Sequence, residues 1–362
     1  MRTRLLWCLA GLLAVVSGPA LSGCGRPADL EPPSVAASPA SVPSVASVPF
    51  PASGVGDLLA RFVAANNAAN AARDDALLRT VESGTSLALD LAGYAASRGT
   101  DPSGSRAGSG FDLVDPTWWV TPEGGAGPRW AVVRARGRSR AAGSAAAPSL
   151  TYLAFVQEAP GRGWLQEYAV DADPGSGPVP DPTGSPCSGA GDTAALSRLV
   201  AGWLASLGGR GSDAVAGERF RALRAAQVQA QRVALAGLGA RGELDEPQLT
   251  ADVLDRRPER VASLTLPGGG CLAFFATQER RTYRASTAAG LTVAGAYRAL
   301  GVDRALGVDR AHGVDRGGAE VRAVVAEVVS VDQWLAVVPP DGTTLPGQIL
   351  GHAGGLVEVR LG

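Results

Sequence analysis

Residues 129–170 decide the fold class: they read RWAVVRARGRSRAAGSAAAPSLTYLAFVQEAPGRGWLQEYAV. Three runs rich in β-branched and aromatic residues, 129–138, 150–158 and 163–170, are separated by segments of Gly, Pro, Ser and Ala. Such runs between turn-forming residues are typical of strands that pair antiparallel. A fourth run, FDLVDPTWWV at 111–120, precedes them. The sequence therefore predicts a four-stranded antiparallel sheet.

Helical spacing precedes this sheet. Apolar residues recur every three or four positions from Leu58 to Ala65, after Asp57, which is suited to be an N-cap. A second helix is expected at 74–82, because paired acidic residues at its start favour the positive end of the helix dipole, and a third at 85–97. Helices followed by an antiparallel sheet predict an α+β layer fold.

The second half of the chain repeats this order. A Pro/Gly/Asp-rich linker at 172–191 is followed by expected helices at 192–207 and 217–238. Expected strands follow at 248–254, 261–266, 271–284, 320–329, 334–338 and 356–361. We therefore predict two tandem helix-then-antiparallel-sheet units, in domains 55–171 and 192–362. Their order favours the cone-shaped packing of nuclear-transport-factor-like or cystatin-like proteins, an analogy of architecture that carries no function.

A hexapeptide repeat interrupts the second unit. Residues 299–316 read ALGVDR, ALGVDR and AHGVDR. Because a solenoid needs more repeats to bury a continuous core, three copies predict a surface loop. His312 stands where the other copies have leucine, which argues against a catalytic role for it.

The N-terminus has the pattern of a targeting segment. Arg2 and Arg4 precede an apolar stretch at 5–20, which is too short to span a bilayer, and 1–23 is therefore expected to be a signal peptide. Leu21-Ser-Gly-Cys24 resembles the lipobox of bacterial lipoproteins, in which the cysteine is acylated. Cys24 is then the lipid attachment site, and the Pro/Ser/Ala-rich residues 24–54 form a spacer. The alternative is a plain secretory signal with an incidental cysteine.

The composition excludes several kinds of chemistry. There is no lysine, which excludes a P-loop, a Schiff base and an S-x-x-K nucleophile, and the only histidines are His312 and His352. A His-rich metal site is therefore excluded, and we expect no metal and no cofactor. The net charge is −1 and the charged fraction 19%, a balance that does not favour nucleic acid as a partner.

Cys187 and Cys271 are the other cysteines of the chain beyond the signal peptide. In an oxidising compartment a pair of cysteines favours a disulfide bond. The alternative is two separate buried thiols.

Two clusters of polar residues are candidate binding sites. Alternation on a strand would place four guanidinium groups on one side, as a basic stripe suited to phosphate or an anionic polymer, or else as a solvated hairpin end: Arg134, Arg136, Arg138 and Arg140. All three asparagines, Asn66, Asn67 and Asn70, fall within the first helix. They would line a cavity between helix and sheet, or else bond to neighbouring backbone and water.

A family resemblance accompanies these patterns. The segments NAANA at 67–71, LLRTVESG at 77–84, LAFV at 153–156 and GGGCLAFFA at 268–276 resemble a family of uncharacterised actinobacterial lipoproteins defined by a domain of unknown function (DUF8094-type). The scarcity of lysine, isoleucine and asparagine, whose codons are rich in A and T, also indicates a GC-rich genome. The resemblance implies a lipid anchor and a two-part α+β ectodomain, and it supplies no catalytic residues.

These observations favour a non-enzymatic binding or scaffolding lipoprotein on the extracytoplasmic face of the plasma membrane. Its expected partners are the lipid bilayer, through acylated Cys24, and an envelope protein or an anionic wall polymer. The alternative is a small-molecule carrier or an enzyme that uses a cone-shaped cavity, with polar groups such as Asn70, Tyr94 or Asp90 inside it.

Overall fold

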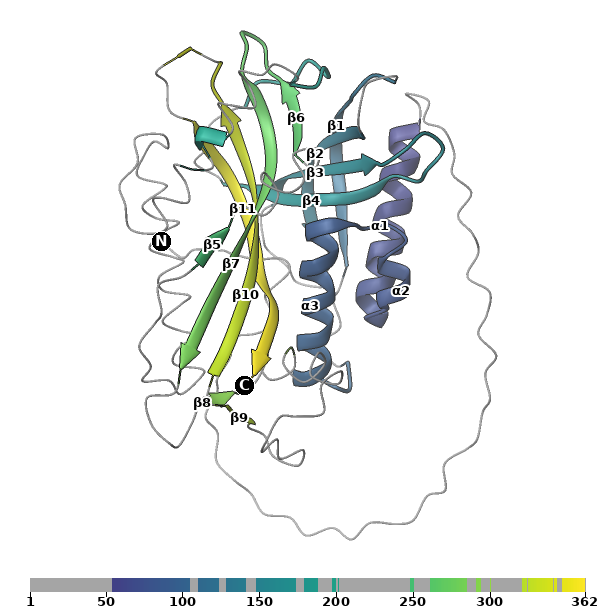
Figure 1. The fold of residues 1–362 in the computed structure, drawn as a ribbon. Coiled ribbons are helices and arrows are strands. Elements are labelled where there is room, and N and C mark those ends of the chain that lie inside the picture. The colour runs from purple at the N-terminus through teal and green to yellow at the C-terminus, as the bar shows by residue number, and fades with distance from the viewer. Residues whose placement is uncertain are drawn as a thin grey trace.

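The fold is seen in a computed structural model of the chain (Figure 1). The structure describes residues 54–104, 110–123, 128–140, 148–173, 179–187, 197–199, 201, 248–250, 261–284, 291–293, 300, 321–323, 325–340, 342–343 and 347–361. The signal peptide, the spacer before Gly54, the expected helices at 192–207 (apart from a few residues) and 217–238, and the repeat loop beyond Leu300 lie outside this part.

Three helices open the described chain: α1 (Gly54–Ala72), α2 (Asp75–Leu78) and α3 (Gly84–Thr100). Asp57 does not cap α1 as predicted, because the helix already begins at Gly54 and places Asp57 in its first turn. The second helix is shorter than predicted. Asp74 caps it by accepting hydrogen bonds from the Ala76 and Leu77 N–H groups, and the chain leaves the helix after Leu78.

The four strands predicted from residues 111–170 are confirmed. They are β1 (Phe111–Val120), β2 (Arg129–Ser139), β3 (Ser149–Gln157) and β4 (Leu165–Ala172), and each pairs antiparallel with the next. The order of these strands in the sheet is their order in the chain, because short connections join each strand to the next.

The remaining strands are β5 (Gln248–Thr250), β6 (Ala262–Thr265), β7 (Cys271–Arg284), β8 (Leu291–Val293), β9 (Val321–Ala323), β10 (Val325–Val338) and β11 (Gln348–Leu361). The predicted interruption between 329 and 334 is wrong, since β10 runs through Asp332 and Gln333. β11 begins eight residues before the predicted start at 356. Polar residues and glycines interrupt the apolar pattern of both strands, so the sequence alone does not show their full length.

One nine-stranded antiparallel sheet contains strands from both predicted units, in the order β1-β2-β3-β4-β11-β10-β7-β5, with β6 also paired to β7. The two halves meet where Gly351 of β11 pairs with Ala172 of β4, and Asp173 N–H donates to Leu350 O at 2.9 Å. A Cβ at Gly351 would overlap the Asp171 carbonyl oxygen, so glycine permits this approach. In Figure 1, β3 and β4 run across β7, β10 and β11.

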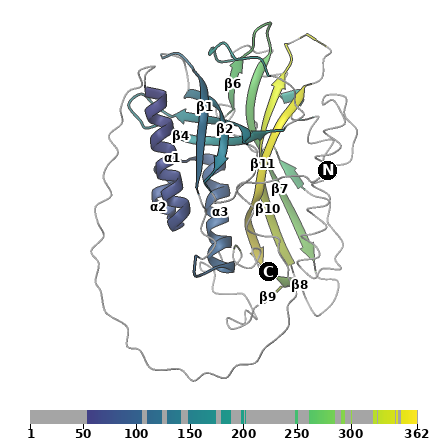
Figure 2. The same cartoon turned by 180° about the vertical axis from the view of Figure 1, so that it is seen from behind.

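Apolar side chains of β2 and β3 contribute to two separate buried clusters. In one cluster, strands of the first half of the chain pack against β6, β7, β10 and β11 around Trp130, Tyr168 and Phe274. In the other cluster, α1 covers β2 and β3 through Leu58 and Phe62. The helices gather on one side of the molecule and β7 and β10 on the opposite side in both views (Figure 1, Figure 2).

Buried polar side chains join α3 to the sheet. The Gln333 Nε2 atom of β10 donates to Thr85 and Ser86 Oγ atoms at 2.9 Å, and its Oε1 accepts from Ala169 N–H. The Glu167 carboxylate accepts from the Ser83 hydroxyl at 2.6 Å. It lies so close to Gly84, whose φ is +50°, that a Cβ there would overlap it. The start of α3 is therefore fixed by side chains from two distant strands.

The structure is thus a mixed α and β fold with a large antiparallel sheet and few helices. The domain boundaries at 171 and 192 stay predictions. Of the predicted linker at 172–191, residues 183–187 hydrogen-bond along β6, through Thr183, Ser185 and Cys187. None of the described helices is both long and apolar enough to cross a membrane.

Candidate functional site

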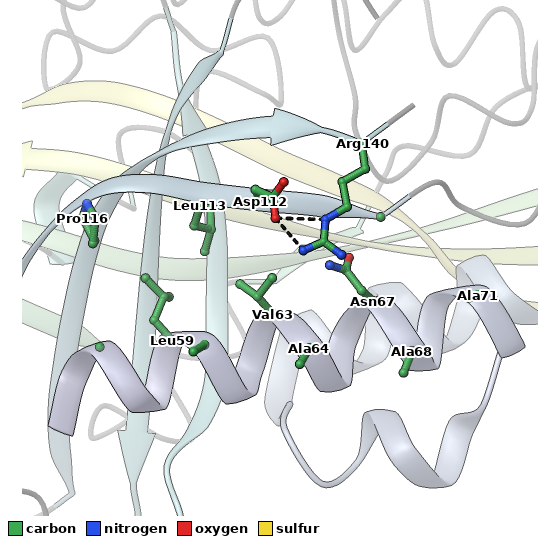
Figure 3. A pocket seen from close by; sticks show the side chains of 13 residues that line it. Leu59, Val63, Ala64, Asn67, Ala68, Ala71, Asp112, Leu113, Pro116 and Arg140 are labelled. Carbon is green, nitrogen blue, oxygen red and sulfur yellow. Dashed lines mark hydrogen bonds and ion pairs between the residues drawn. The ribbon is translucent and has the colours of Figure 1, made fainter. Parts of the chain in front are cut away.

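An open groove of about 790 Å³ lies between α1 and β1, an edge strand of the sheet (Figure 3). Apolar side chains from both elements form its floor, among them Leu59, Val63 and Leu113. The other lining residues are mostly small, with three polar side chains: Gly56, Ala60, Ala64, Asn67, Ala68, Ala71, Gly110, Asp112, Pro116 and Arg140.

The wall that α1 contributes is made of very small side chains. Gly56, Ala60, Ala64 and Ala68 recur every four residues, so they lie along one stripe of the helix, and all are exposed. Their side chains end at Cβ or earlier. The helix backbone therefore stays accessible from the groove, and no side chain of the described lining fills the space.

Asn67 ties the start of β1 to α1. Its Nδ2 donates to Phe111 O at 2.8 Å, and its Oδ1 accepts from Phe111 N–H at 2.9 Å. These two bonds take the place of a neighbouring strand, so the outer edge of β1 at Phe111 faces α1. By strand alternation the Leu113 backbone groups face the same way, into the groove.

An ion pair closes one end of the groove. Arg140 donates from Nε and Nη2 to the same Asp112 oxygen, at 2.9 and 2.6 Å (Figure 3). The hydrogen bond from Arg140 lowers the pKa of the Asp112 carboxyl. Both groups are solvent-exposed, so the pair can exchange for a charged or polar group of a ligand at little cost.

The other two asparagines lie on a different face of α1. Tyr94 donates its hydroxyl proton to Asn70 Oδ1 at 2.7 Å, Asn70 Nδ2 donates to Asn66 Oδ1 at 2.6 Å, and Asn66 Nδ2 donates to Glu82 Oε1. Of the three predicted cavity residues, Asn67 lines the groove, while Asn66 and Asn70 belong to this buried network. Sequence reasoning missed Glu82, because a single acid at the expected end of a helix is an ordinary surface residue.

The basic stripe is partly neutralised. Arg134 pairs with Asp181 at 2.6 Å, and its guanidinium lies 5.4 Å from the Trp119 ring centroid. Arg140 pairs with Asp112, as above. Arg136 and Arg138 are exposed on β2 and form no ion pair with a described residue. A binding role for the whole stripe stays a prediction.

The described part of the chain also contains a disulfide bond and a histidine–aspartate pair. The predicted bond between Cys187 and Cys271 is present and links the segment beside β6 to the start of β7. His352, on β11, pairs with Asp332 at 2.7 Å, and its ring packs at a tilt against Trp334. Within the described ranges, no cluster of three His, Cys, Asp or Glu residues is placed to hold a metal ion. His312 lies outside those ranges.

Comparison with known proteins identifies the family. No curated protein and no solved structure matches the chain. A family described as a domain of unknown function, DUF8094, matches residues 55–357, which include nearly all of the described helices and of the sheet. The predicted resemblance to this domain is therefore confirmed, and the chain belongs to the DUF8094 family.

Proposed function

We propose that this protein is a lipid-anchored, extracytoplasmic lipoprotein of an actinobacterial cell envelope, and that it acts as a non-enzymatic binding or scaffolding module. The observation that supports this function best is the open groove between α1 and β1. The core beneath it is filled by large side chains such as Phe62 and Phe155, whose ring centroids are 5.2 Å apart. A filled core beside an accessible apolar groove favours partner binding over a buried cavity.

The lipid anchor is supported by the sequence of the first 24 residues. Acylation of Cys24 would hold the protein at the outer face of the plasma membrane, and the spacer before α1 would raise the folded part above the headgroups. We expect Cys24→Ala to move the protein from the membrane fraction to the medium, or to leave it as unprocessed precursor. Fractionation and mass spectrometry of the N-terminus measure this, and unchanged acylation would refute the anchor.

The groove fits a short extended segment of an envelope protein. Leu113 offers backbone groups at a sheet edge, the alanines of α1 leave room for a peptide backbone, and Leu59 and Val63 offer apolar contact. The bulge between Val114 and Thr117, with Pro116, limits strand pairing to a few residues. The partner segment would therefore be short.

A second candidate is a carrier or enzyme that takes a small amphipathic ligand. The groove volume, about 790 Å³, lies within the range of small-molecule sites, and Arg140 and Asp112 are polar groups at its end. The cone-shaped packing proposed from the sequence is compatible with this arrangement, because three helices lie on one side of a curved sheet and the groove opens between these layers.

Filling the groove tests both candidates. Ala64→Trp places an indole on the exposed wall of α1, and we expect retention of the natural partner or ligand by the full-length protein to fall at least tenfold. Ala72→Trp is the matched control, since Ala72 is exposed on the same helix but does not line the groove. Equal loss in both variants, or in neither, would contradict binding at this groove.

A further inference from the structure

The charged side chains that line the groove all lie at one end of it. Among the described lining residues, only Asp112 and Arg140 carry a charge. Arg140 N–H donates to Gly110 O at 3.0 Å, so both residues lie at the start of β1. The remaining lining is apolar or small apart from the Asn67 amide, which is bonded to Phe111. A ligand therefore meets apolar surface along the groove and charge at one end.

Arginine outnumbers acid at this charged end. In the pairing of β1 with β2, Arg138 lies directly opposite Asp112, and Arg136 lies opposite Val114. Directly opposite residues project to the same face of a sheet, so the Arg138 guanidinium and the Asp112 carboxylate share a face. Arg136 and Arg138 are exposed, and neither forms an ion pair with a described residue.

The sequence around these strand ends adds no further acid. Residues 111–114 and 136–140 contain three arginines and one aspartate, and residues 141–148, which follow, contain no charged residue. The charge of this end of the groove is therefore positive, which favours an anionic group on the ligand.

The ion pair at this end has the features of a replaceable contact. Arg140 donates from Nε and Nη2 to a single Asp112 oxygen, at 2.9 and 2.6 Å, whereas a carboxylate and a guanidinium can form two parallel bonds through both oxygens (Figure 3). The Arg140 side chain is 51% exposed and that of Asp112 is 41% exposed. A carboxylate that arrives from solvent can therefore reach Arg140 and take the place of Asp112.

We propose that the segment bound in the groove carries a carboxylate, and that this carboxylate binds Arg140 in place of Asp112. The inference rests on the proposed binding function of the groove and specifies the chemistry of its partner. Asp112 is then an internal competitor, which occupies Arg140 in the free protein and stays opposite Arg138 when the partner is bound. Apolar residues of the same segment contact Leu59 and Val63.

The two members of the ion pair should change binding in opposite directions. Asp112→Asn removes the competing charge, so an acidic segment should bind more tightly, whereas Arg140→Gln removes the group that binds its carboxylate. An ion pair with a structural role alone would give the same direction for both variants, because either substitution breaks it. Because exposed ion pairs contribute modestly, we expect each variant to change Kd by up to about fivefold.

Peptides selected on the protein provide the probe. The full-length wild-type protein in detergent selects from a displayed library of random hexapeptides, and fluorescence polarisation measures the Kd of the most enriched peptide with each variant. We expect Asp or Glu at a fixed position among apolar residues, tighter binding by Asp112→Asn and weaker binding by Arg140→Gln. The difference between the two variants should shrink at high salt, which screens exposed charges.

Two further variants make the outcomes distinguishable. Arg98→Gln is the matched control and should keep the wild-type Kd, because Arg98 and Asp75 form a similarly exposed ion pair, 42% and 43%, outside the groove lining. Ala64→Trp tests the groove itself.

Each outcome then decides between the inference and the function on which it rests. Peptides that lose binding in Ala64→Trp but contain no acid would overturn the inference and leave groove binding intact. Equal Kd values, or changes in the same direction, for Asp112→Asn and Arg140→Gln would do the same. If no peptide is enriched, or if Ala64→Trp binds like the wild type, binding at the groove is refuted and the inference with it.

Discussion

Removal of the Cys187–Cys271 disulfide is expected to lower the free energy of unfolding by about 4 kcal/mol. The bond joins residues 84 apart in sequence, so it removes a large share of the conformational freedom of the unfolded chain. It also holds the segment whose Thr183 and Cys187 amides hydrogen-bond to β6. We expect Cys187→Ala/Cys271→Ala to unfold at a much lower urea concentration than the oxidised wild type.

Reduction provides the matched control for this variant. A thiol reductant should destabilise the wild type to about the level of the double alanine variant, and it should leave that variant unchanged. A double variant as stable as the oxidised wild type would show that the bond contributes nothing to the fold. Both measurements use the same urea titration followed by tryptophan fluorescence.

Trp334→Ala is expected to cost about 3–5 kcal/mol, because it opens a large cavity in the sheet. The indole is fully buried on β10. Its ring centroid lies 4.3 Å from that of His352 and 6.4 Å from that of Phe275, and its N–H donates to Thr277 at 2.8 Å. The substitution therefore removes packing and leaves a buried hydroxyl without its donor.

Two further substitutions separate the loss of packing from the loss of the hydrogen bond to Thr277. Trp334→Phe keeps an aromatic ring but loses the bond to Thr277, so a smaller loss of about 1–2 kcal/mol is expected. Trp118→Ala removes a tryptophan that is 40% exposed, and its effect should be within about 1 kcal/mol. Thermal unfolding measures all three. A Trp334→Ala protein no less stable than Trp118→Ala would contradict the packing described for β10.

The sequence predicts the first four strands of the sheet well because their pairing is local. In β1 to β4, each strand pairs with the next one in the chain, and glycine, proline and serine mark the turns. β10 and β11 are harder to predict. Gln333 interrupts an apolar pattern, and its partners Thr85 and Ala169 lie 248 and 164 residues away in sequence. No local window contains the contacts that make a buried glutamine favourable in that strand.

Local sequence patterns also do not show which side chains of the candidate site lie together. Helical spacing correctly places the three asparagines on α1, but one step along a helix turns a side chain by about 100°, which separates Asn67 from Asn66 and Asn70. Only the tertiary structure shows that Asn67 faces β1 while the other two reach Glu82. Likewise, strand alternation predicts a row of arginines, but Asp181 and Asp112 neutralise two of them from elsewhere in the chain.

The most direct test of partner binding is site-specific photo-cross-linking in the native host. A photoreactive side chain at Ala71, at the end of the groove, is compared with the same group at Ala72, its exposed neighbour outside the groove. We expect the group at Ala71 to capture a short segment of one envelope protein, the group at Ala72 to capture none, and Ala64→Trp to abolish the product. Identical products from both positions would contradict it, and a small molecule captured at one-to-one stoichiometry would instead establish the carrier.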